Sequence, residues 1–503
     1  MKNKIIDILK SFSADEIKKF NVYLASPYFN RSRKIQRLYS EIINFSPFYN
    51  SAGFNYKNLH IKVSPHIPYN SITMRRLLAD LEKYALDFLR QINLDKDEIS
   101  THNYLRDELQ SRSLSKLFEN SVNEFEEKFG SENYIDERYF VNKLNLETDK
   151  LNYSYISKNL SKKMNVNSLI LYLVTASKYL FLYFTMKMVS YYLNLLIMQT
   201  NYKNTEERDS LYKFLVKFFD DIDNFYLKEF LKDKVNDYYY VYDIYFNLFK
   251  AFSGKMDVRY YNKCKKLLTA NAKYFRTSEK NILFGKLIDF CELRQRVNPE
   301  DEFSKKELFR LYELFLSKKY YESENSSHLP IPLFRNIVNF AIRNKKYAWA
   351  EKFIKIYSNR LYPDFKNDLK NLGFARVAFN RSQFTDTLRY MSKVNPEAPN
   401  AKLDYKNLNI MVHYELGNYE TVRNAIESYK LFIRRSGVVS KENKVYYRNF
   451  IHYTEKLINF INNRNKTYFE SLTDSIKTAD MLVYKAWLLS KANALASMKT
   501  KAA

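Results

Sequence analysis

The sequence predicts an all-α protein: a solenoid of helical hairpins preceded by a small N-terminal helical module. The chain of 503 residues contains only 7 glycines and 10 prolines, the residues that tight turns and hairpin sheets need. Apolar residues recur at spacings of three and four along most of its length, as on the buried face of a helix. Finally, the last third of the chain contains self-similar segments, which are typical of repeat architectures.

The chain is strongly basic, with 82 Lys and Arg against 56 Asp and Glu and a formal net charge of +26. Such a balance suggests a nucleic-acid partner or an anionic surface. However, abundant Lys, Asn, Tyr, Phe and Ile beside few Gly, Ala and Pro is also what an AT-rich coding sequence produces. The charge therefore has two interpretations, a dedicated binding surface or a solvated surface without a specific partner.

Cysteine usage and the N-terminus indicate a reducing, cytoplasmic location. Cys264 and Cys291 are too few for a disulfide framework or a zinc cluster. The first residues lack the apolar core and cleavage site of a signal peptide. The most apolar stretch, residues 168–186, contains Lys178 and is followed by Lys187. Because a charge in the bilayer is costly, we expect a pair of buried solenoid helices there and no membrane insertion.

Residues 1–92 are expected to form the N-terminal helical module. Ser13 and Glu16 stand at capping-box spacing before an amphipathic helix. Ser26-Pro27 ends that helix, because the residue before a proline resists the α region. Residues 70–90 carry an apolar stripe at helical spacing and close the module.

The stretch Ser26-Pro-Tyr-Phe-Asn30, followed by Arg-Ser-Arg-Lys, allows three interpretations: a nucleic-acid grip, a docking turn for a partner, or a corner between helices. We favour the corner, in which Tyr28 and Phe29 pack across the junction and Asn30 or Ser32 caps the next helix. Together with Pro68-Tyr69-Asn70 and the helix at 74–89, this stretch resembles a group of bacterial helical proteins without an assigned activity.

Residues 93–330 predict an array of helical hairpins. The run Tyr238 to Tyr242 favours a strand by propensity, but its apolar spacing favours a helix. Two acidic clusters, residues 220–223 and 300–302, are interpreted as helix starts, where carboxylates complement the helix dipole.

The self-similar segments each place an aromatic residue after a polar turn. Tyr347, Phe384 and Tyr419 are 37 and 35 residues apart. A small or β-branched residue follows three positions later in each segment. We expect these residues to pack the repeats together: Tyr347, Ala350, Phe384, Thr387, Gly417, Tyr419 and Val422.

This pattern resembles the tetratricopeptide repeat, a helix-turn-helix unit of 34 residues. The best match is Leu416-Gly417-Asn418-Tyr419, whereas glycine is missing from the other two turns and Thr387 and Val422 replace the expected alanine. The resemblance implies degenerate repeats over residues 331–470 and a closing helix within 471–503.

The sequence offers no catalytic, cofactor-binding or metal-binding residues. Its glycines never approach the spacing of a phosphate loop or a dinucleotide fingerprint. Its six histidines form no i, i+4 pair, and His413 is interpreted as a packing residue. We therefore expect a protein that is not an enzyme and uses no cofactor.

Two functions remain, and we prefer a non-enzymatic scaffold or adaptor whose solenoid binds a protein or peptide partner. The alternative is a nucleic-acid-associated regulator that uses its basic N-terminal module. The candidate nucleic-acid contacts are Arg33, Lys34, Arg37, Arg75, Arg76, Arg434 and Arg435.

Overall fold

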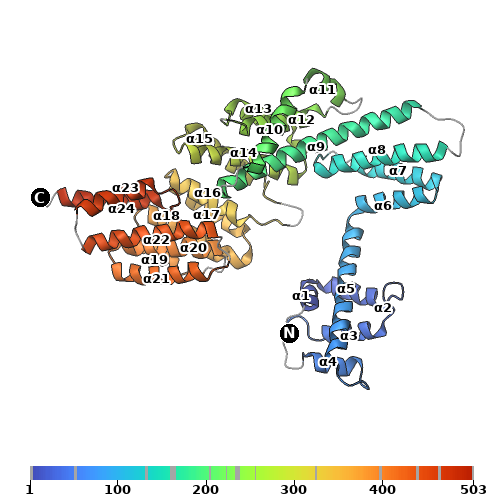
Figure 1. Cartoon of the computed structure of the whole chain (residues 1–503), viewed down its shortest axis with the longest axis horizontal. Coiled ribbons are helices and arrows are strands. Elements are labelled where there is room, and N and C mark those ends of the chain that lie inside the picture. The colour runs from blue at the N-terminus through green and yellow to red at the C-terminus, as the bar shows by residue number, and fades with distance from the viewer. Residues whose placement is uncertain are drawn as a thin grey trace. The chain divides into compact units, whose positions relative to one another are not determined.

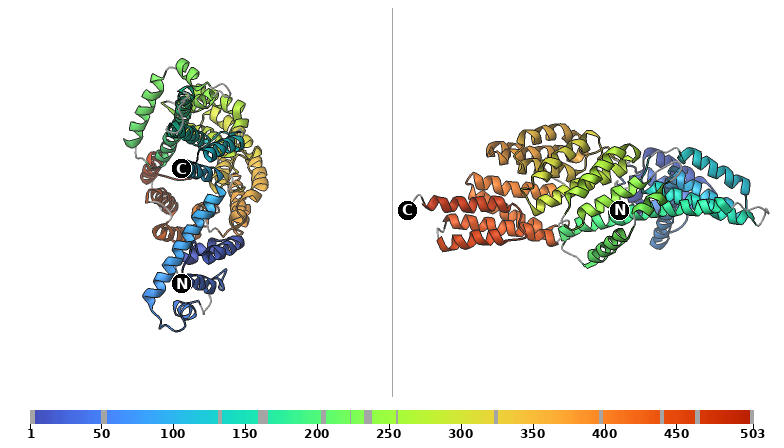
Figure 2. Two further views of the ribbon diagram at one scale, coloured as in Figure 1. Left: turned by 90° about the vertical axis from the view of Figure 1, so that its right-hand side faces the viewer. Right: turned by 90° about the horizontal axis from the view of Figure 1, so that it is seen from above.

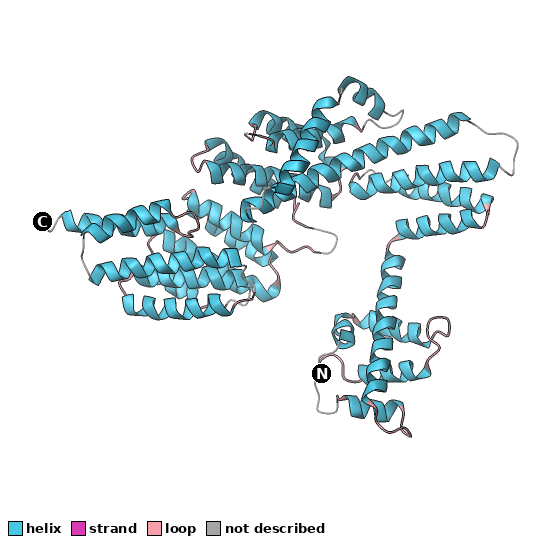
Figure 3. Ribbon diagram, viewed as in Figure 1, coloured by secondary structure: helices cyan, strands magenta, loops and turns pink. Residues whose placement is uncertain are grey.

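The protein is described by a computed structural model whose helices and loops are drawn in Figure 3. The described residues are 4–49, 54–130, 134–158, 166–202, 206–222, 224–232, 238–254, 256–322, 326–395, 399–437, 441–462 and 466–500. Within these ranges the chain forms 24 α-helices, and the β-interaction found there is one isolated parallel bridge between Ile135 and Phe275. The all-α prediction is therefore confirmed.

The chain divides into two compact units. Unit 1 comprises Met1–Asn133 and Phe140–Leu180, and unit 2 comprises Tyr134–Tyr139 and Phe181–Ala503. The short segment from Tyr134 joins unit 2 through the bridge to Phe275. The four segments expected from the sequence, with boundaries near 92, 330 and 470, are a finer division and stay predictions.

Unit 1 contains the first seven helices, all but the first residues of the eighth, and the beginning of the ninth (Figure 1). Their bounds are α1 (Lys4–Ser11), α2 (Ala14–Ala25), α3 (Arg33–Ile43), α4 (Tyr56–Val63), α5 (Ser71–Lys96), α6 (Glu98–Ser111), α7 (Ser115–Gly130), α8 (Glu137–Lys158) and α9 (Val166–Tyr202).

An aromatic cluster holds α2, α3 and α5 together. The ring of Phe20 lies 5.5 Å from Phe12, 5.0 Å from Tyr39 and 5.0 Å from Phe88, measured between centroids. Phe88 belongs to the predicted apolar stripe of α5, whose members Met74, Leu78, Leu81 and Ala85 are also buried. The predicted capping box is confirmed, because the Glu16 amide donates to Ser13 Oγ and the Ser13 amide donates to Glu16 Oε2.

The corner after α2 depends on Asn30. Its Nδ2 donates to the carbonyl of Leu24 at 2.8 Å, and its Oδ1 accepts from the amide of Ser32 at 2.8 Å. Phe29 stacks on Tyr23 with centroids 4.3 Å apart, as expected, but Tyr28 is 86% exposed and does not pack into the junction. The predicted side-chain cap on α3 is also wrong, since the N-cap residue Ser32 makes no such hydrogen bond.

A buried arginine joins α6, α7 and α8. Arg106 is fully buried, and its Nε donates to Asp149 Oδ2 at 2.8 Å. Its guanidinium also lies 4.7 Å from the ring centroid of Phe125. A buried charge must be paired in this way, since removing one partner leaves an uncompensated ion.

Unit 2 contains the rest of α9 and all later helices. Their bounds are α10 (Glu206–Asp221), α11 (Asn224–Leu231), α12 (Tyr239–Phe252), α13 (Val258–Asn271), η1 (Ala272–Tyr274), α14 (Thr277–Val297), α15 (Glu302–Ser317), α16 (Ile331–Arg343), α17 (Tyr347–Tyr357), η2 (Ser358–Arg360), α18 (Pro363–Asn380), α19 (Phe384–Met391), α20 (Pro399–Glu415), α21 (Tyr419–Arg435), α22 (Lys441–Asn462), α23 (Lys466–Thr478) and α24 (Lys485–Thr500).

From α12 to α21 the helices pair in sequence, α12 with α13, α14 with α15, and so on to α20 with α21. First helices of successive pairs also touch, since α16 contacts α18 and α18 contacts α20. The helices coloured yellow to red lie side by side in both Figure 1 and Figure 2. Stacking of this kind buries the apolar face that no single hairpin can bury alone.

The turns inside three hairpins share one backbone conformation. Lys345, Ser382 and Gly417 each stand just after a helix with positive φ, at 57°, 60° and 75°. In each turn this residue donates to the carbonyl three positions earlier, and the next residue donates five positions back. This is the Schellman arrangement that satisfies the last carbonyls of a helix. It is retained although only one of the three residues is glycine.

The structure corrects some of the sequence expectations about helix boundaries and confirms others. The apolar stretch around residues 168–186 is part of one long helix, α9, and not a pair of helices. Asp220 and Asp221 end α10 instead of starting a helix, whereas Asp223, directly before α11, lies outside the described residues. Asp301 is the N-cap of α15, as expected. The ambiguous Tyr-rich run enters α12 and is helical.

By length and composition alone, residues Val166–Met198 of α9 could cross a membrane. Of an apolar 18-residue stretch within this segment, 28% is buried.

Candidate functional site

The repeat residues form the contacts between and within the C-terminal hairpins. Ala350, Thr387 and Val422, which follow each aromatic by three positions, are all fully buried. The aromatics Tyr347, Phe384 and Tyr419 are half-buried at the start of the second helix of each hairpin. Gly417 is exposed in the turn.

The first helices of the hairpins line a hollow of about 800 Å³, the central groove. Its lining comes from α14, α16, α18, α20 and α22, and from the chain that enters α24. Four asparagines and several apolar side chains are prominent in the lining: Asn336, Asn339, Asn380, Asn407, Ile342, Phe379, Leu408, Met411, Val483 and Trp487. One helix from each repeat therefore faces the same groove.

An ion cluster fixes the helices beneath this groove. Asp404 of α20 is buried and accepts from Arg335 Nε of α16 at 2.8 Å. The carboxylate also lies 3.6 Å from Arg376 Nη1 of α18. The cluster links three successive first helices and leaves the charge of Asp404 compensated, as a buried carboxylate requires.

Two asparagines of the groove lining have side-chain oxygens without a hydrogen-bond partner among the described residues. Asn407 is 1% exposed, and its Oδ1 has no hydrogen-bond partner among the described residues. The same holds for the Oδ1 of Asn339 within that part of the chain. A buried acceptor without a partner costs about 1 to 3 kcal/mol, so it calls for a structural or functional explanation. Both oxygens are enclosed by protein atoms, so the explanation lies in the packing behind the groove and not in a ligand within it.

Tyrosine hydroxyls border the same groove. Burial raises the pKa of Tyr484 to about 12, with nearby Asp404 and Tyr447 adding to the rise. The pKa of Tyr447 is also raised, again mainly by burial. Both hydroxyls therefore stay protonated at neutral pH and can donate to an acceptor in the groove.

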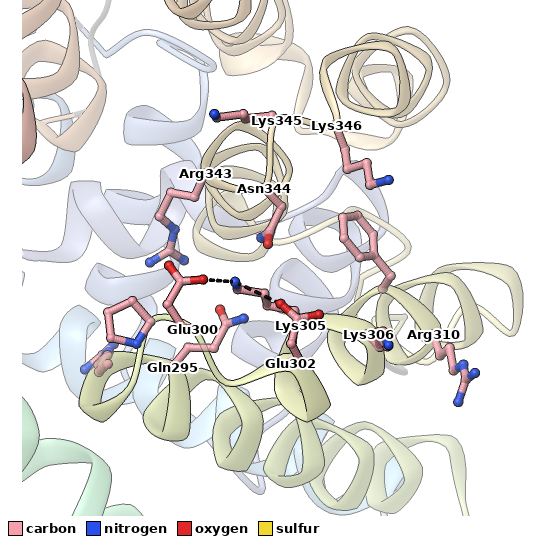
Figure 4. Close-up of a pocket in the computed structure, with 13 residues that line it drawn as sticks. Gln295, Glu300, Glu302, Lys305, Lys306, Arg310, Arg343, Asn344, Lys345 and Lys346 are labelled. Atoms are coloured by element: carbon pink, nitrogen blue, oxygen red, sulfur yellow. Dashed lines mark hydrogen bonds and ion pairs between the residues drawn. The ribbon is translucent and has the colours of Figure 1, made fainter.

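A second hollow, the basic hollow, has a volume of about 1080 Å³ (Figure 4). It is formed by the end of α14, the start of α15, and the turn from α16 to α17. Its thirteen lining residues are Gln295, Arg296, Pro299, Glu300, Glu302, Lys305, Lys306, Phe309, Arg310, Arg343, Asn344, Lys345 and Lys346.

The charges of the basic hollow are unevenly paired. Lys305 Nζ lies 2.6 Å from Glu300 Oε2 and 3.2 Å from Glu302 Oε1, so the two carboxylates share this lysine. Figure 4 shows Arg343 and Asn344 facing this group from the end of α16, whereas Arg310 and Lys345 point away from it. Seven cations and two carboxylates thus line one hollow.

The candidate nucleic-acid contacts lie on separate elements. Arg33, Lys34 and Arg37 are exposed on the first two turns of α3, and Arg75 and Arg76 are exposed near the start of α5. Neither helix has an acidic residue in its first turn, so these cations are not matched to the helix dipole.

Arg434 and Arg435 occupy the last turn of α21, where cations stabilise a helix. A stabilising role accounts for this pair without any ligand. The seven predicted cations thus come from α3 and α5 of unit 1 and from α21 of unit 2.

Other chemistry-bearing residues are buried or dispersed. Among the described residues, no three His, Cys, Asp or Glu side chains are grouped so as to hold a metal ion. Cys264 and Cys291 are both buried free thiols. Burial raises both thiol pKa values, that of Cys291 to about 12. His413 is half-buried, and burial lowers its pKa.

Sequence reasoning missed both hollows. The basic hollow joins the pairs Lys305-Lys306 and Lys345-Lys346, which are 40 residues apart and carry no motif. The central groove joins asparagines whose shared face appears only once the hairpins stack. A signal was present in the asparagines at positions 336 and 339, which are three apart and therefore neighbours on one helix face.

In comparisons with protein families, curated sequences and solved structures, no family model, no curated protein and no solved structure matches this chain.

Proposed function

We propose that the protein is a non-enzymatic adaptor whose central groove binds an extended peptide segment of a protein partner. The observation that carries the proposal is the groove itself, which is lined with amides and apolar side chains by one helix from each of four hairpins, by α22 and by the start of α24. Extended peptides are recognised by hydrogen bonds to their main chain and by pockets for alternate side chains.

Several features support this proposal. The exposed amides of Asn336 and Asn380 suit main-chain groups of a peptide, and the hydroxyls of Tyr447 and Tyr484 suit main-chain carbonyls. Leu408 and Met411 provide apolar contact between them. The ion cluster at Asp404 holds the lining helices in place before any ligand arrives, which lowers the entropic cost of binding.

A tetratricopeptide-like arrangement is part of the same proposal. Its support is the shared turn conformation at Lys345, Ser382 and Gly417, together with the buried residues at 350, 387 and 422. In such an arrangement, first helices line a concave binding surface and second helices cover the outside.

Groove binding can be tested with peptides selected from a random dodecamer display library on the full chain. We expect enriched peptides to bind wild-type protein in fluorescence anisotropy and to lose at least about tenfold in affinity on Ala486→Trp, because an exposed groove alanine becomes a bulky ring. Asn336→Ala and Asn380→Ala should each weaken binding about 2- to 10-fold through lost hydrogen bonds.

The matched control is Ala270→Trp, which places the same bulk at an exposed alanine of α13 outside both hollows. This variant should bind the selected peptides like wild type, and circular dichroism should show both tryptophan variants to be folded. Failure to enrich any peptide, or equal binding by Ala486→Trp and wild type, would contradict the proposal.

The nucleic-acid role of the N-terminal module is the alternative. Its support is the exposure of Arg33, Lys34 and Arg37 at the start of α3 without a neighbouring acid in that turn. It is the weaker proposal, because its five cations are divided between α3 and α5, and a solvated surface of a lysine-rich chain also accounts for them.

A further inference from the structure

We infer that the basic hollow binds an acidic stretch of a partner peptide, next to the segment that occupies the central groove. The inference rests on the proposed function and adds the chemistry of the partner: glutamates and aspartates at one end of the bound segment.

The composition of the chain does not explain the charge of this hollow. Lys and Arg make up 82 of the 503 residues, about a sixth, but seven of the thirteen residues that line the hollow. The lining is therefore about three times richer in cations than the chain as a whole. Surfaces are richer in Lys and Arg than whole chains, but the ratio of seven cations to two carboxylates in this lining also exceeds the ratio of 82 to 56 in the chain.

Most of these cations have no carboxylate of their own. Lys305 is shared by Glu300 and Glu302. In the part of the chain that the structure describes, Lys306, Arg310, Arg343, Lys345 and Lys346 form no ion pair within 4.0 Å. These five come from α15 and from the α16–α17 turn, which are separate elements of the sequence. Repulsion among them falls when an anionic ligand binds.

The basic hollow and the central groove share two lining residues and therefore adjoin each other. Arg296 at the end of α14 and Arg343 at the end of α16 line both. A peptide that leaves the groove past these two arginines therefore enters the hollow. Its main chain would be held by amides in the groove and its acidic side chains by cations in the hollow, so the two parts supply different kinds of recognition.

The lining suits an acidic peptide better than a nucleic acid. Single-stranded nucleic acid needs free aromatic faces for base stacking. Phe309 is the one aromatic lining residue, and its ring packs against Phe340 at 4.6 Å and Trp349 at 5.4 Å.

The test uses fluorescein-labelled decaglutamate and the oligonucleotide dT10 as probes of the full chain, by anisotropy at low and high salt. The hollow variant carries Lys306→Glu, Arg310→Glu, Lys345→Glu and Lys346→Glu, and leaves the shared arginines intact. We expect decaglutamate to bind wild-type protein with strong salt dependence and to lose about 30-fold in affinity in the hollow variant.

A matched control has the same change in net charge at Arg33→Glu, Lys34→Glu, Arg37→Glu and Arg75→Glu, all exposed in unit 1. It should change decaglutamate affinity by no more than about threefold. The inference is overturned if wild-type protein does not bind decaglutamate at low salt, if the two quadruple variants lose affinity equally, or if dT10 binds more tightly than decaglutamate and is lost in the hollow variant.

The two proposals fail separately. Ala486→Trp should abolish binding of groove-selected peptides but leave decaglutamate binding intact, whereas the hollow variant should do the reverse. Adding five glutamates to one end of a groove-selected peptide should raise its affinity at least tenfold, and adding them to the other end should not. Groove binding without any gain at either end would sink the inference and leave the proposed function standing.

Discussion

Asn30 shows how one side chain can set the path of the chain. It is 6% exposed, and all three of its hydrogen bonds go to backbone groups on either side of the corner between α2 and α3. An amide suits this place because it donates and accepts at once. Arg31, Arg33 and Lys34 lie beside it and are exposed, so these basic residues do not stabilise the corner.

Asn30→Ala is expected to destabilise the N-terminal module by about 2 kcal/mol, because it leaves the Leu24 carbonyl and the Ser32 amide without their partner. Hydrogen exchange measured by mass spectrometry on peptides from residues 14–43 should show faster opening. Tyr28→Ala is the control and should stay within about 0.5 kcal/mol of wild type, since Tyr28 is 86% exposed. Equal effects of the two substitutions would contradict this role of Asn30.

The turn at Ser382 offers a second prediction at this scale. Its φ of 60° is in the left-handed region, which disfavours residues with a Cβ. Ser382→Gly should therefore stabilise the α18–α19 hairpin by about 1 kcal/mol, and Gly417→Ser should cost the α20–α21 hairpin a similar amount. Thermal unfolding followed by circular dichroism would measure both.

Ser392→Gly is the matched control for that prediction, because Ser392 ends α19 with a φ of −63° and has no strain to relieve. It should lower stability by about 0.5 to 1 kcal/mol. Stabilisation by Ser392→Gly, or none by Ser382→Gly, would mean that the turn geometry does not control hairpin stability.

Between elements, tyrosine–glutamate hydrogen bonds join one helix to another. Tyr261 of α13 donates to Glu307 of α15 at 2.8 Å, and Tyr312 of α15 donates to Glu292 of α14 at 2.6 Å. Tyr245 of α12 donates to Glu279 of α14. Phenol donors let these helices bury carboxyl groups in a contact that would otherwise be apolar.

Glu279 should make the stability of this contact depend on pH. Its pKa is raised from 4.5 to about 7, mainly by burial; Glu137 and Asp136 contribute to the rise, and Tyr245 and Lys187 oppose it. The folded protein therefore keeps this proton at pH values where the unfolded chain has released it. Stability conferred by α12 and α14 should fall as pH rises from about 4.5 to 7, by about 3 kcal/mol, and stay low above pH 7.

Glu279→Gln keeps an acceptor for Tyr245 but cannot ionise, so it should flatten this dependence and protect α12 and α14 at pH 8. Hydrogen exchange of peptides from both helices between pH 5 and 8, corrected for intrinsic rates, would measure it. Glu313→Gln, at an exposed position of α15, should leave the profile unchanged. An unchanged profile in Glu279→Gln would show that another group titrates.

For the whole molecule, the sequence predicted far more of the fold than of the candidate site. Helical periodicity identified the helix after Ser13, the helix with the apolar stripe at residues 70–90 and the helix at the Tyr-rich run, because each depends on residues three and four apart. Periodicity failed on α9, which was expected to be a pair of helices. A helix that is apolar on most sides gives no periodic pattern from which its ends can be located. Periodicity also failed on Tyr28, since a short turn does not reveal which of two aromatics turns inward.

By itself, therefore, the sequence determined the all-α class, the hairpin turns and the buried positions 350, 387 and 422, because these follow from local spacing and backbone sterics. Only the tertiary structure decided that asparagines from α16, α18 and α20 line one groove, and that Lys306 and Lys346 line one hollow. The physical reason is that a binding surface of stacked hairpins is made of residues about 35 to 40 positions apart. Their proximity is set by how helices pack, which no local pattern encodes.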